Sequence, residues 1–414
     1  MGIFESASLV VVVAAAFGFL NQLSLRLPPS VALTISGGLI ALAVAMAHGL
    51  FPENQAGHQI YSVLTQIDFK ASVLNVMLSF LLFAGALHIK LPDLKRVLGL
   101  VLSLATLGAL ISTLLVALGL HLITKLIGPT IPFGWCLVFG ALISPTDPVA
   151  VIALMQRSQA PPLLRTTLAA ESLFNDGVGI VLFTVLLGLA QSGAPLMLGP
   201  AAIECLSVGG GGLLFGLALG GVGLLMMRLI DDYETEALIC LALVMGGYVS
   251  ANAIGISGPV AMAVAGIMVG NLGVSHAMSA QSQDRLLKFW DLIELLLNAT
   301  LFLLLGIQGI GLLATPTILA VGMACIPMVL LARGLSLMPS LFAFRRRLPM
   351  SATLPLFTWG GLRGGLCIAM ALSTPAFAAR NEIIAATYLV AIFSVVVQGL
   401  TLSPLLRPLH PRPS

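Results

Sequence analysis

The sequence predicts an all-α polytopic membrane protein, and three observations support this class. Of its 414 residues, 58% are hydrophobic and 8% are charged, whereas soluble domains carry about 25% charged residues. Apolar runs long enough to cross roughly 30 Å of hydrocarbon recur from end to end of the chain. These runs are continuous and lack the alternation, in segments of roughly ten residues, that is typical of a transmembrane β-barrel.

The apolar runs predict about 13 transmembrane helices. Their linkers are short and polar or rich in proline and glycine, so residues 1–414 are expected to form a single transmembrane domain without a soluble regulatory domain. The expected helices have the approximate limits 7–25, 30–50, 71–89, 97–124, 133–156, 166–190, 201–227, 236–255, 257–275, 287–309, 313–341, 353–377 and 382–406.

The basic residues predict how these helices are oriented in the membrane. With 13 spans, an external N-terminus and a cytoplasmic C-terminus, Lys70, Lys125 and Arg380 lie outside, and Arg333 and Arg363 lie within the membrane. The other 14 of the 19 basic residues then lie on the cytoplasmic side. Such an excess of positive charge on the inside supports both the orientation and the odd number of helices.

Two of the expected helices are interrupted by helix-breaking residues. The fifth contains Pro145 and Pro148 around Asp147, and each proline removes a backbone donor and clashes with the carbonyl four residues earlier. The twelfth has four glycines within 360–365, around Arg363, which weaken the helix there. The twelfth helix lies seven positions after the fifth, so the two run in opposite directions across the membrane.

Opposite directions are typical of inverted repeats. We expect one repeat over about 7–190 and a second over about 236–406, with the helix over about 201–227 as their linker. This expectation depends on hydropathy and on the two interruptions.

Ionisable residues at membrane depth are costly and are therefore functional candidates. The sixth helix carries Glu171, Ser172, Asn175 and Asp176 within two turns. Glu171 shares one helix face with Asn175, and Ser172 shares the adjacent face with Asp176. Carboxylate, amide and hydroxyl oxygens suit alkali cations and protons, and without a nearby histidine or cysteine the group does not suit zinc or iron.

The remaining intramembrane charges each have a structural alternative. Glu171 is expected to pair with Arg333, because a lone buried arginine cannot discharge. Asp147 either takes part in ion binding or compensates the dipoles of two half-helices, and Arg363 is expected to act as a fixed positive charge at the broken ends of the twelfth helix. Asp291 and Glu294 are expected to be interfacial.

Several other functions are unsupported by the sequence. The five cysteines are scattered singly through apolar segments, without metal or redox spacing, and are expected to be small buried hydrophobes. Without a basic face, nucleic acid is not an expected partner. Without a Gly-rich phosphate loop, ATP use is not expected. The protein is expected to be a transporter and not an enzyme.

Three motifs of the sequence are SPTDPVA over residues 144–150, ESLFNDG over residues 171–177 and WGGLRG over residues 359–364. They resemble the signature helices of the monovalent cation:proton antiporter family, in its NhaP-type branch, which is related to the animal sodium/proton exchangers. The resemblance extends over nearly the whole chain in helix number and order. It implies the NhaA/NhaP-like fold, in which helices 5 and 12 cross near the midplane, and a homodimer among lipids of the cell (inner) membrane.

In that branch, the aspartate that matches Asp176 binds the cation and the proton in turn. Ser172 and the backbone carbonyl of Thr146 are the further ligands of Na⁺ that the resemblance implies. Asp147 would help through water or by dipole compensation, and Glu171 with Arg333 resembles the structural ion pair of the family. The implied activity is exchange of Na⁺ or Li⁺ for H⁺ as part of pH homeostasis, without a cofactor.

Two further features bear on stoichiometry and selectivity. Asn175 before Asp176 resembles the electroneutral branch, because electrogenic relatives have two aspartates at these positions. Some relatives carry a glutamate in helix 3 after a Leu-Leu-Phe sequence, and this chain has Ala84 there instead. One possible cation ligand is therefore missing.

Burial disfavours the charged form of an acid, so a cation and a proton would compete to neutralise Asp176. Exchange is then obligatory if the site reorients readily only when neutralised. Three alternatives stay open: a K⁺/H⁺ antiporter, a passive cation channel, and an intramembrane aspartyl protease with Asp147 and Asp176 as its dyad.

Overall fold

The computed structural model describes residues 3–50, 72–147, 151–152, 155, 161–193, 197–273, 278–308, 316–346 and 350–402. The described chain is helical, with several π-helical turns (η) and one isolated backbone bridge. The elements are α1 (Ile3–Leu20), η1 (Asn21–Leu25), α2 (Pro29–Leu50), η2 (Ser72–Met77), α5 (Leu78–Leu87), α6 (Leu91–Ser103), η3 (Leu104–Gly108), α7 (Ala109–Ile127), α8 (Phe133–Ile143), α10 (Pro162–Ser192), α11 (Leu198–Met227), α12 (Tyr233–Ala253), α13 (Gly258–Met268), η4 (Val269–Gly273), α15 (Ala280–Ile307), α16 (Pro316–Ala343), α17 (Met350–Trp359), α18 (Gly365–Ser373), α19 (Arg380–Phe393), η6 (Ser394–Gln398) and α20 (Gly399–Thr401).

The helices confirm the polytopic all-α class. Nine described helical stretches are long and apolar enough to cross a membrane, and three shorter apolar helices are α5, α8 and α13 with η4. The interrupted pair of α17 and α18 accounts for the remaining expected segment. Each apolar run of the sequence therefore coincides with a helix or an interrupted helix in the described ranges.

Two helices begin earlier than their apolar runs. The fourth begins at Leu91 rather than near residue 97, and the tenth begins at Ala280 rather than near residue 287. Pro92 and Asp93 in the first turn of α6 suit a helix N-terminus. The Ser279 hydroxyl caps α15 by accepting a hydrogen bond from the Ser282 amide at 3.3 Å. Polar first turns are invisible to hydropathy, which explains the difference.

Caps also fix the short connection before α12. The Asp232 carboxylate accepts hydrogen bonds from the Thr235 amide at 3.0 Å and from the Thr235 hydroxyl at 2.6 Å. These bonds favour the ionised acid and hold the pKa of Asp232 below its usual range. The cap satisfies one of the amides that a helix start leaves without a partner.

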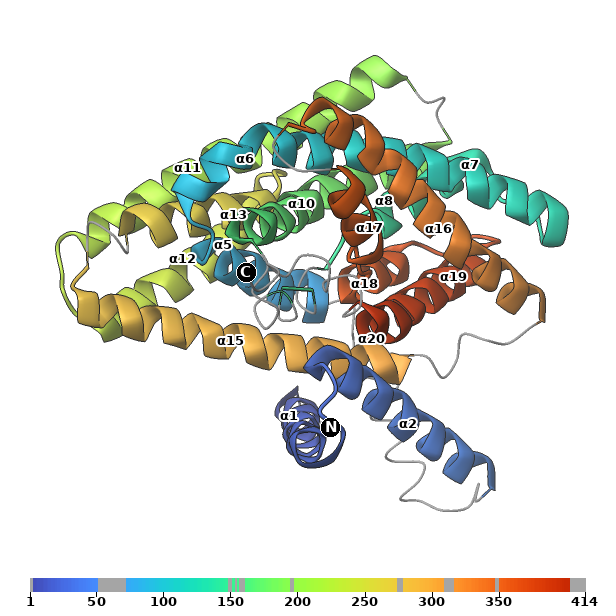
Figure 1. Ribbon diagram of the computed structural model, residues 1–414, viewed down its shortest axis with the longest axis horizontal. Coiled ribbons are helices and arrows are strands. Elements are labelled where there is room, and N and C mark those ends of the chain that lie inside the picture. The colour runs from blue at the N-terminus through green and yellow to red at the C-terminus, as the bar shows by residue number, and fades with distance from the viewer. Residues whose placement is uncertain are drawn as a thin grey trace, which may run out of the picture.

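Three apolar cores meet at a central helix. Figure 1 shows α11, α12 and α13 on one side of the molecule and α7, α16 and α19 on the other, with α10, α8, α17 and α18 between them. Helix α10 belongs to all three cores: Leu168 packs in one, Leu173 in the second and Leu182 in the third. The charged segment of α10 therefore lies where the cores meet.

Candidate functional site

The two interrupted helices cross each other. Helix α8 ends at Ile143 and α17 ends at Trp359, and beyond these ends the Asp147 amide donates a 2.7 Å hydrogen bond to the Leu362 carbonyl. This pair is an isolated antiparallel bridge. A Cβ on Gly364 would lie 2.6 Å from Asp147 Oδ2, so glycine is required for the close approach. The expected crossing of helices 5 and 12 is thereby confirmed, although Pro148, Val149 and Ala150 lie outside the described residues.

The fixed positive charge at the crossing is Arg363, which is 2% exposed. Its Nη1 donates hydrogen bonds to the carbonyls of Ser144 at 2.5 Å and Pro145 at 2.8 Å. Prolines in the fifth helix free carbonyl groups from helical hydrogen bonding, and the guanidinium satisfies two carbonyls at the end of α8. Arg363 thus connects the two interruptions through its side chain, as Leu362 does through its backbone.

The sixth helix of the sequence analysis is α10, and it presents two faces to the crossing. On the first face, the Ser172 hydroxyl donates a hydrogen bond to the Thr146 carbonyl. Asp176 lies one turn further along the same face and is half-buried. The structure thus brings together the three residues that the resemblance implies as sodium ligands.

On the adjacent face, Asn175 and Glu171 form a buried network with Arg333 of α16. Both guanidinium Nη atoms of Arg333 donate to the Glu171 carboxylate at 3.1 Å, and the side chains are 3% and 1% exposed. The Asn175 amide nitrogen donates to Glu171 Oε1 at 3.3 Å and to the Ser144 carbonyl at 3.2 Å. The Asn175 Oδ1 atom is buried and has no hydrogen-bond partner within the described ranges. It is therefore an available oxygen beside Asp176.

Charges of both signs act on Asp176. The carboxylates of Asp147 and Glu171 repel its ionised form, and the Arg363 guanidinium attracts it. A bound monovalent cation and a proton shift this balance in the same direction, because each neutralises the Asp176 carboxylate.

A further carboxylate, on α15, interacts electrostatically with the site. Glu294 interacts electrostatically with Asp147 and with Asp291, and the Asp291 carboxylate lies 3.1 Å from His88 Nε2 at the end of α5. Asp291 is exposed and Glu294 is half-buried. The interfacial place expected for both residues stays a prediction.

Sequence reasoning also missed two polar residues of the thirteenth segment. Ser394 and Gln398 are buried in η6. Ser394 accepts a hydrogen bond from the Arg363 amide and Gln398 donates one to the Trp359 carbonyl, at the interruption of the twelfth helix. The available signal was a serine and a glutamine, one turn apart, inside an otherwise apolar run.

The donors at the crossing are hard oxygen atoms from carboxylates, an amide, a hydroxyl and backbone carbonyls. The described residues contain no group of three or more His, Cys, Asp or Glu side chains that could hold a metal ion. Such oxygens suit an alkali cation better than a transition metal.

Comparison with known proteins shows which family the chain belongs to. The family model described as "Sodium/hydrogen exchanger, transmembrane" matches residues 8–407. The chain is 38% identical over 402 residues to the Na⁺/H⁺ antiporter NhaP of Pseudomonas aeruginosa, covering 95% of this chain and 93% of that protein. It is 33% identical over 392 residues to the Na⁺/H⁺ antiporter NhaH of Halobacillus aidingensis, covering 93% of each chain.

The fold is similar to that of a solved antiporter. The structure of the sodium proton antiporter MjNhaP1 from Methanocaldococcus jannaschii superimposes with a TM-score of 0.75 at 23% identity, covering 98% of each chain. Family model, sequence identity and fold agree over almost the full length, and the protein is therefore a member of the transmembrane sodium/hydrogen exchanger family.

Proposed function

We propose that the protein exchanges Na⁺ or Li⁺ for H⁺ across the membrane by alternating access, with Asp176 binding the cation and the proton in turn. The single observation that carries this proposal is the meeting of Asp176 and Ser172 on α10 with the Thr146 carbonyl at the crossed interruptions. Relatives of 38% and 33% identity are Na⁺/H⁺ antiporters by name, which favours sodium over potassium.

The proposed sodium ligands are the Asp176 carboxylate, the Ser172 hydroxyl and the Thr146 carbonyl. Asn175 adds its amide oxygen or orients the site, and Asp147 contributes through water or by compensating the half-helix dipoles. Arg363 holds the freed carbonyls of the fifth helix in place throughout the cycle, because an arginine does not deprotonate in proteins. Glu171 and Arg333 form the structural pair beside the site.

Exchange follows from competition. A proton and a cation each neutralise Asp176 and exclude one another, and a neutral site crosses the low-dielectric interior at far lower cost than a charged one. The ion gradients supply the driving force, and the transport needs no cofactor. A passive channel would instead require a continuous pore with a charged ring or carbonyl filter.

We further infer the setting in which this transport takes place. The inverted repeats over about 7–190 and 236–406 suit rocking of one helix group against the other. We infer a homodimer in the cell (inner) membrane, as the resemblance implies. The distribution of basic residues supports an N-terminus outside and a C-terminus in the cytoplasm. Family membership supports a transporter rather than the aspartyl protease that remained open at the level of sequence.

The proposal is tested with the purified protein in vesicles that contain a pH-sensitive dye. Addition of NaCl, LiCl or KCl in turn should produce dequenching with Na⁺ or Li⁺, and a response to K⁺ alone would replace sodium by potassium as the substrate. Asp176→Asn should abolish the signal while the protein still inserts and elutes as the parent does. The matched control is Glu234→Gln, which removes an exposed carboxylate of α12 away from the crossing. Substantial sodium-driven proton movement by Asp176→Asn, at any pH, would contradict the role of Asp176 as the residue that binds the cation and the proton.

A further inference from the structure

The interruption of the twelfth helix leaves backbone groups outside any helix. Between the end of α17 at Trp359 and the start of α18 at Gly365, the chain cannot continue its own hydrogen-bond ladder. Unpaired backbone groups are expensive at membrane depth, and neighbouring helices must satisfy them. The partner of the Trp359 carbonyl and of the Arg363 amide is the last transmembrane segment.

Two side chains of η6 connect these backbone groups in one relay. The Arg363 amide donates to Ser394 Oγ at 2.9 Å, the Ser394 hydroxyl donates to Gln398 Oε1 at 2.5 Å, and Gln398 Nε2 donates to the Trp359 carbonyl at 2.8 Å. Ser394 is 0% exposed and Gln398 is 2% exposed. Each hydrogen-bond donor of the relay faces an acceptor, so the relay holds both ends of the interruption at a fixed separation. We call this relay the Ser394–Gln398 clamp.

The clamp is directly connected to the ion site. Arg363, whose amide it holds, uses its guanidinium to bind the carbonyls of Ser144 and Pro145. Leu362, between the clamped positions, accepts the hydrogen bond of the Asp147 amide. The clamp therefore fixes the segment against which Thr146 and Asp147 are placed, although neither clamp residue reaches the proposed ligands.

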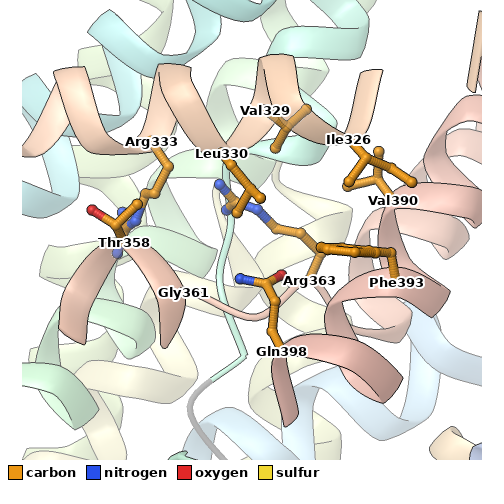
Figure 2. A pocket seen from close by; sticks show the side chains of 10 residues that line it. All are labelled: Ile326, Val329, Leu330, Arg333, Thr358, Gly361, Arg363, Val390, Phe393 and Gln398. Carbon is orange, nitrogen blue, oxygen red and sulfur yellow. The ribbon is translucent and has the colours of Figure 1, made fainter. Parts of the chain in front are cut away.

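The side chain of Arg363 is not held by close packing on every side. A cavity of ≈ 10 Å³ is lined by Arg363, Arg333 and Gln398 among others, and Figure 2 shows Arg363 and Gln398 approaching it from below and Arg333 from α16 above. This is space for about one water molecule. Arg363 Nη2 has no hydrogen-bond partner within the described part of the chain. The hydrogen bonds to Ser144 and Pro145 therefore help to decide where the guanidinium lies.

From this geometry we propose that Ser394 and Gln398 are positioning residues for cation binding, acting through Leu362 and Arg363 on the Thr146 carbonyl and Asp147. Residues that orient the ligands of a metal ion typically change affinity or activity by about 10–100-fold when they are removed. Loss of the clamp loosens the interrupted segment, and the apparent KM for sodium rises. The maximal rate at saturating sodium changes much less, because Asp176 and its neutralisation are intact.

The experiment measures sodium-dependent proton movement in vesicles for the parent, Gln398→Met, Ser394→Ala and the double variant. Gln398→Met keeps the length of the side chain without its hydrogen bonds, and Ser394→Ala removes one hydroxyl. We expect each single variant to raise the apparent KM for sodium about tenfold. The double variant should raise it no further than the stronger single one, because both residues act in one relay and their effects do not add.

The matched control is Thr387→Val on α19. Thr387 is 0% exposed, and its hydroxyl only donates to the Ile383 carbonyl of its own helix at 2.7 Å. It reports on the loss of a buried hydroxyl near the clamp, and its KM should equal that of the parent. Thermal unfolding in detergent separates stability from affinity in all variants.

The inference depends on the proposed antiport, and the two fail in different ways. A parent protein without sodium-driven proton movement would overturn the proposed function. Active single variants whose KM for sodium matches that of Thr387→Val would overturn the clamp alone. A double variant whose effect is the product of the two single effects would also overturn it, since the residues would then act independently.

Discussion

At the scale of the residue, Glu171 and Arg333 form a buried ion pair between α10 and α16. Their two hydrogen bonds at 3.1 Å make a bidentate contact, and Arg333 Nε also donates to the Phe357 carbonyl at 3.4 Å. A buried pair contributes little net stability relative to apolar residues, but a single remaining partner is costly. The pair therefore fixes α10 against α16 beside the ion site.

This balance predicts the behaviour of single and double variants of the pair. Glu171→Gln and Arg333→Ala should each lower the free energy of unfolding by about 3–5 kcal/mol, because each leaves an uncompensated buried charge. The measurement is thermal unfolding of the purified protein in detergent, together with the yield from membranes. Glu171→Gln combined with Arg333→Met removes both charges and should recover much of the loss. Single variants that melt as the parent does would show that the pair does not hold these helices together.

At the scale of the element, close backbone contact joins α2 to α15. A Cβ on Gly37 would lie 2.3 Å from the Leu303 carbonyl oxygen, and one on Gly306 would lie 2.2 Å from the Thr34 carbonyl oxygen. Small residues let transmembrane helices approach this closely, and van der Waals packing then stabilises the pair. Neither obstacle is a flexible side chain, so the helices would have to move apart to admit a methyl group.

The two adjacent glycines of α2 provide a matched test of this contact. Gly37→Ala should lower the free energy of unfolding by about 1–3 kcal/mol through overpacking. Gly38→Ala should be tolerated, because its nearest neighbour would be the Gly306 carbonyl oxygen at 3.8 Å, an ordinary contact. Both variants add one methyl group to one helix, and thermal unfolding in detergent compares them. Equal melting of the two would contradict the close α2–α15 contact.

The elements also show how far sequence reasoning extends. Prolines 145 and 148 and the glycines of 360–365 predicted two interruptions, and the alternation of direction predicted that they oppose each other, because these effects are local. The Ser394–Gln398 clamp was out of reach, since a serine and a glutamine become informative only once η6 is known to face the interruption. The electrostatic interaction between Asp147 and Glu294 was also out of reach, because it depends on how α15 packs against the crossing.

At the scale of the whole molecule, the place of the charges decides how much charge the transport cycle moves. The described residues bring Asp147, Glu171 and Arg363 into the field of Asp176. Glu171 is committed to Arg333, and helix 3 contributes the buried Ala84 in place of a carboxylate. Asn175 can orient its neighbour by hydrogen bonding but cannot carry a proton.

We therefore predict electroneutral exchange, one cation for one proton, with Asp176 as the carrier of both. The test uses vesicles with equal sodium inside and outside and a clamped membrane potential. Imposing the potential should drive no sodium-coupled proton movement, because the loaded site carries the same charge in both directions. Asp147 belongs to the same electrostatic group and is the alternative carrier of a second proton. Proton pumping that depends on sodium and scales with the potential would contradict electroneutrality and assign the second carrier to Asp147.

The variant Asp147→Asn separates the two roles of Asp147. If Asp147 carries charge, the variant should remove the dependence of exchange on the potential. If Asp147 only compensates the half-helix dipoles, exchange in the variant should stay independent of the potential, with the same stoichiometry as in the parent.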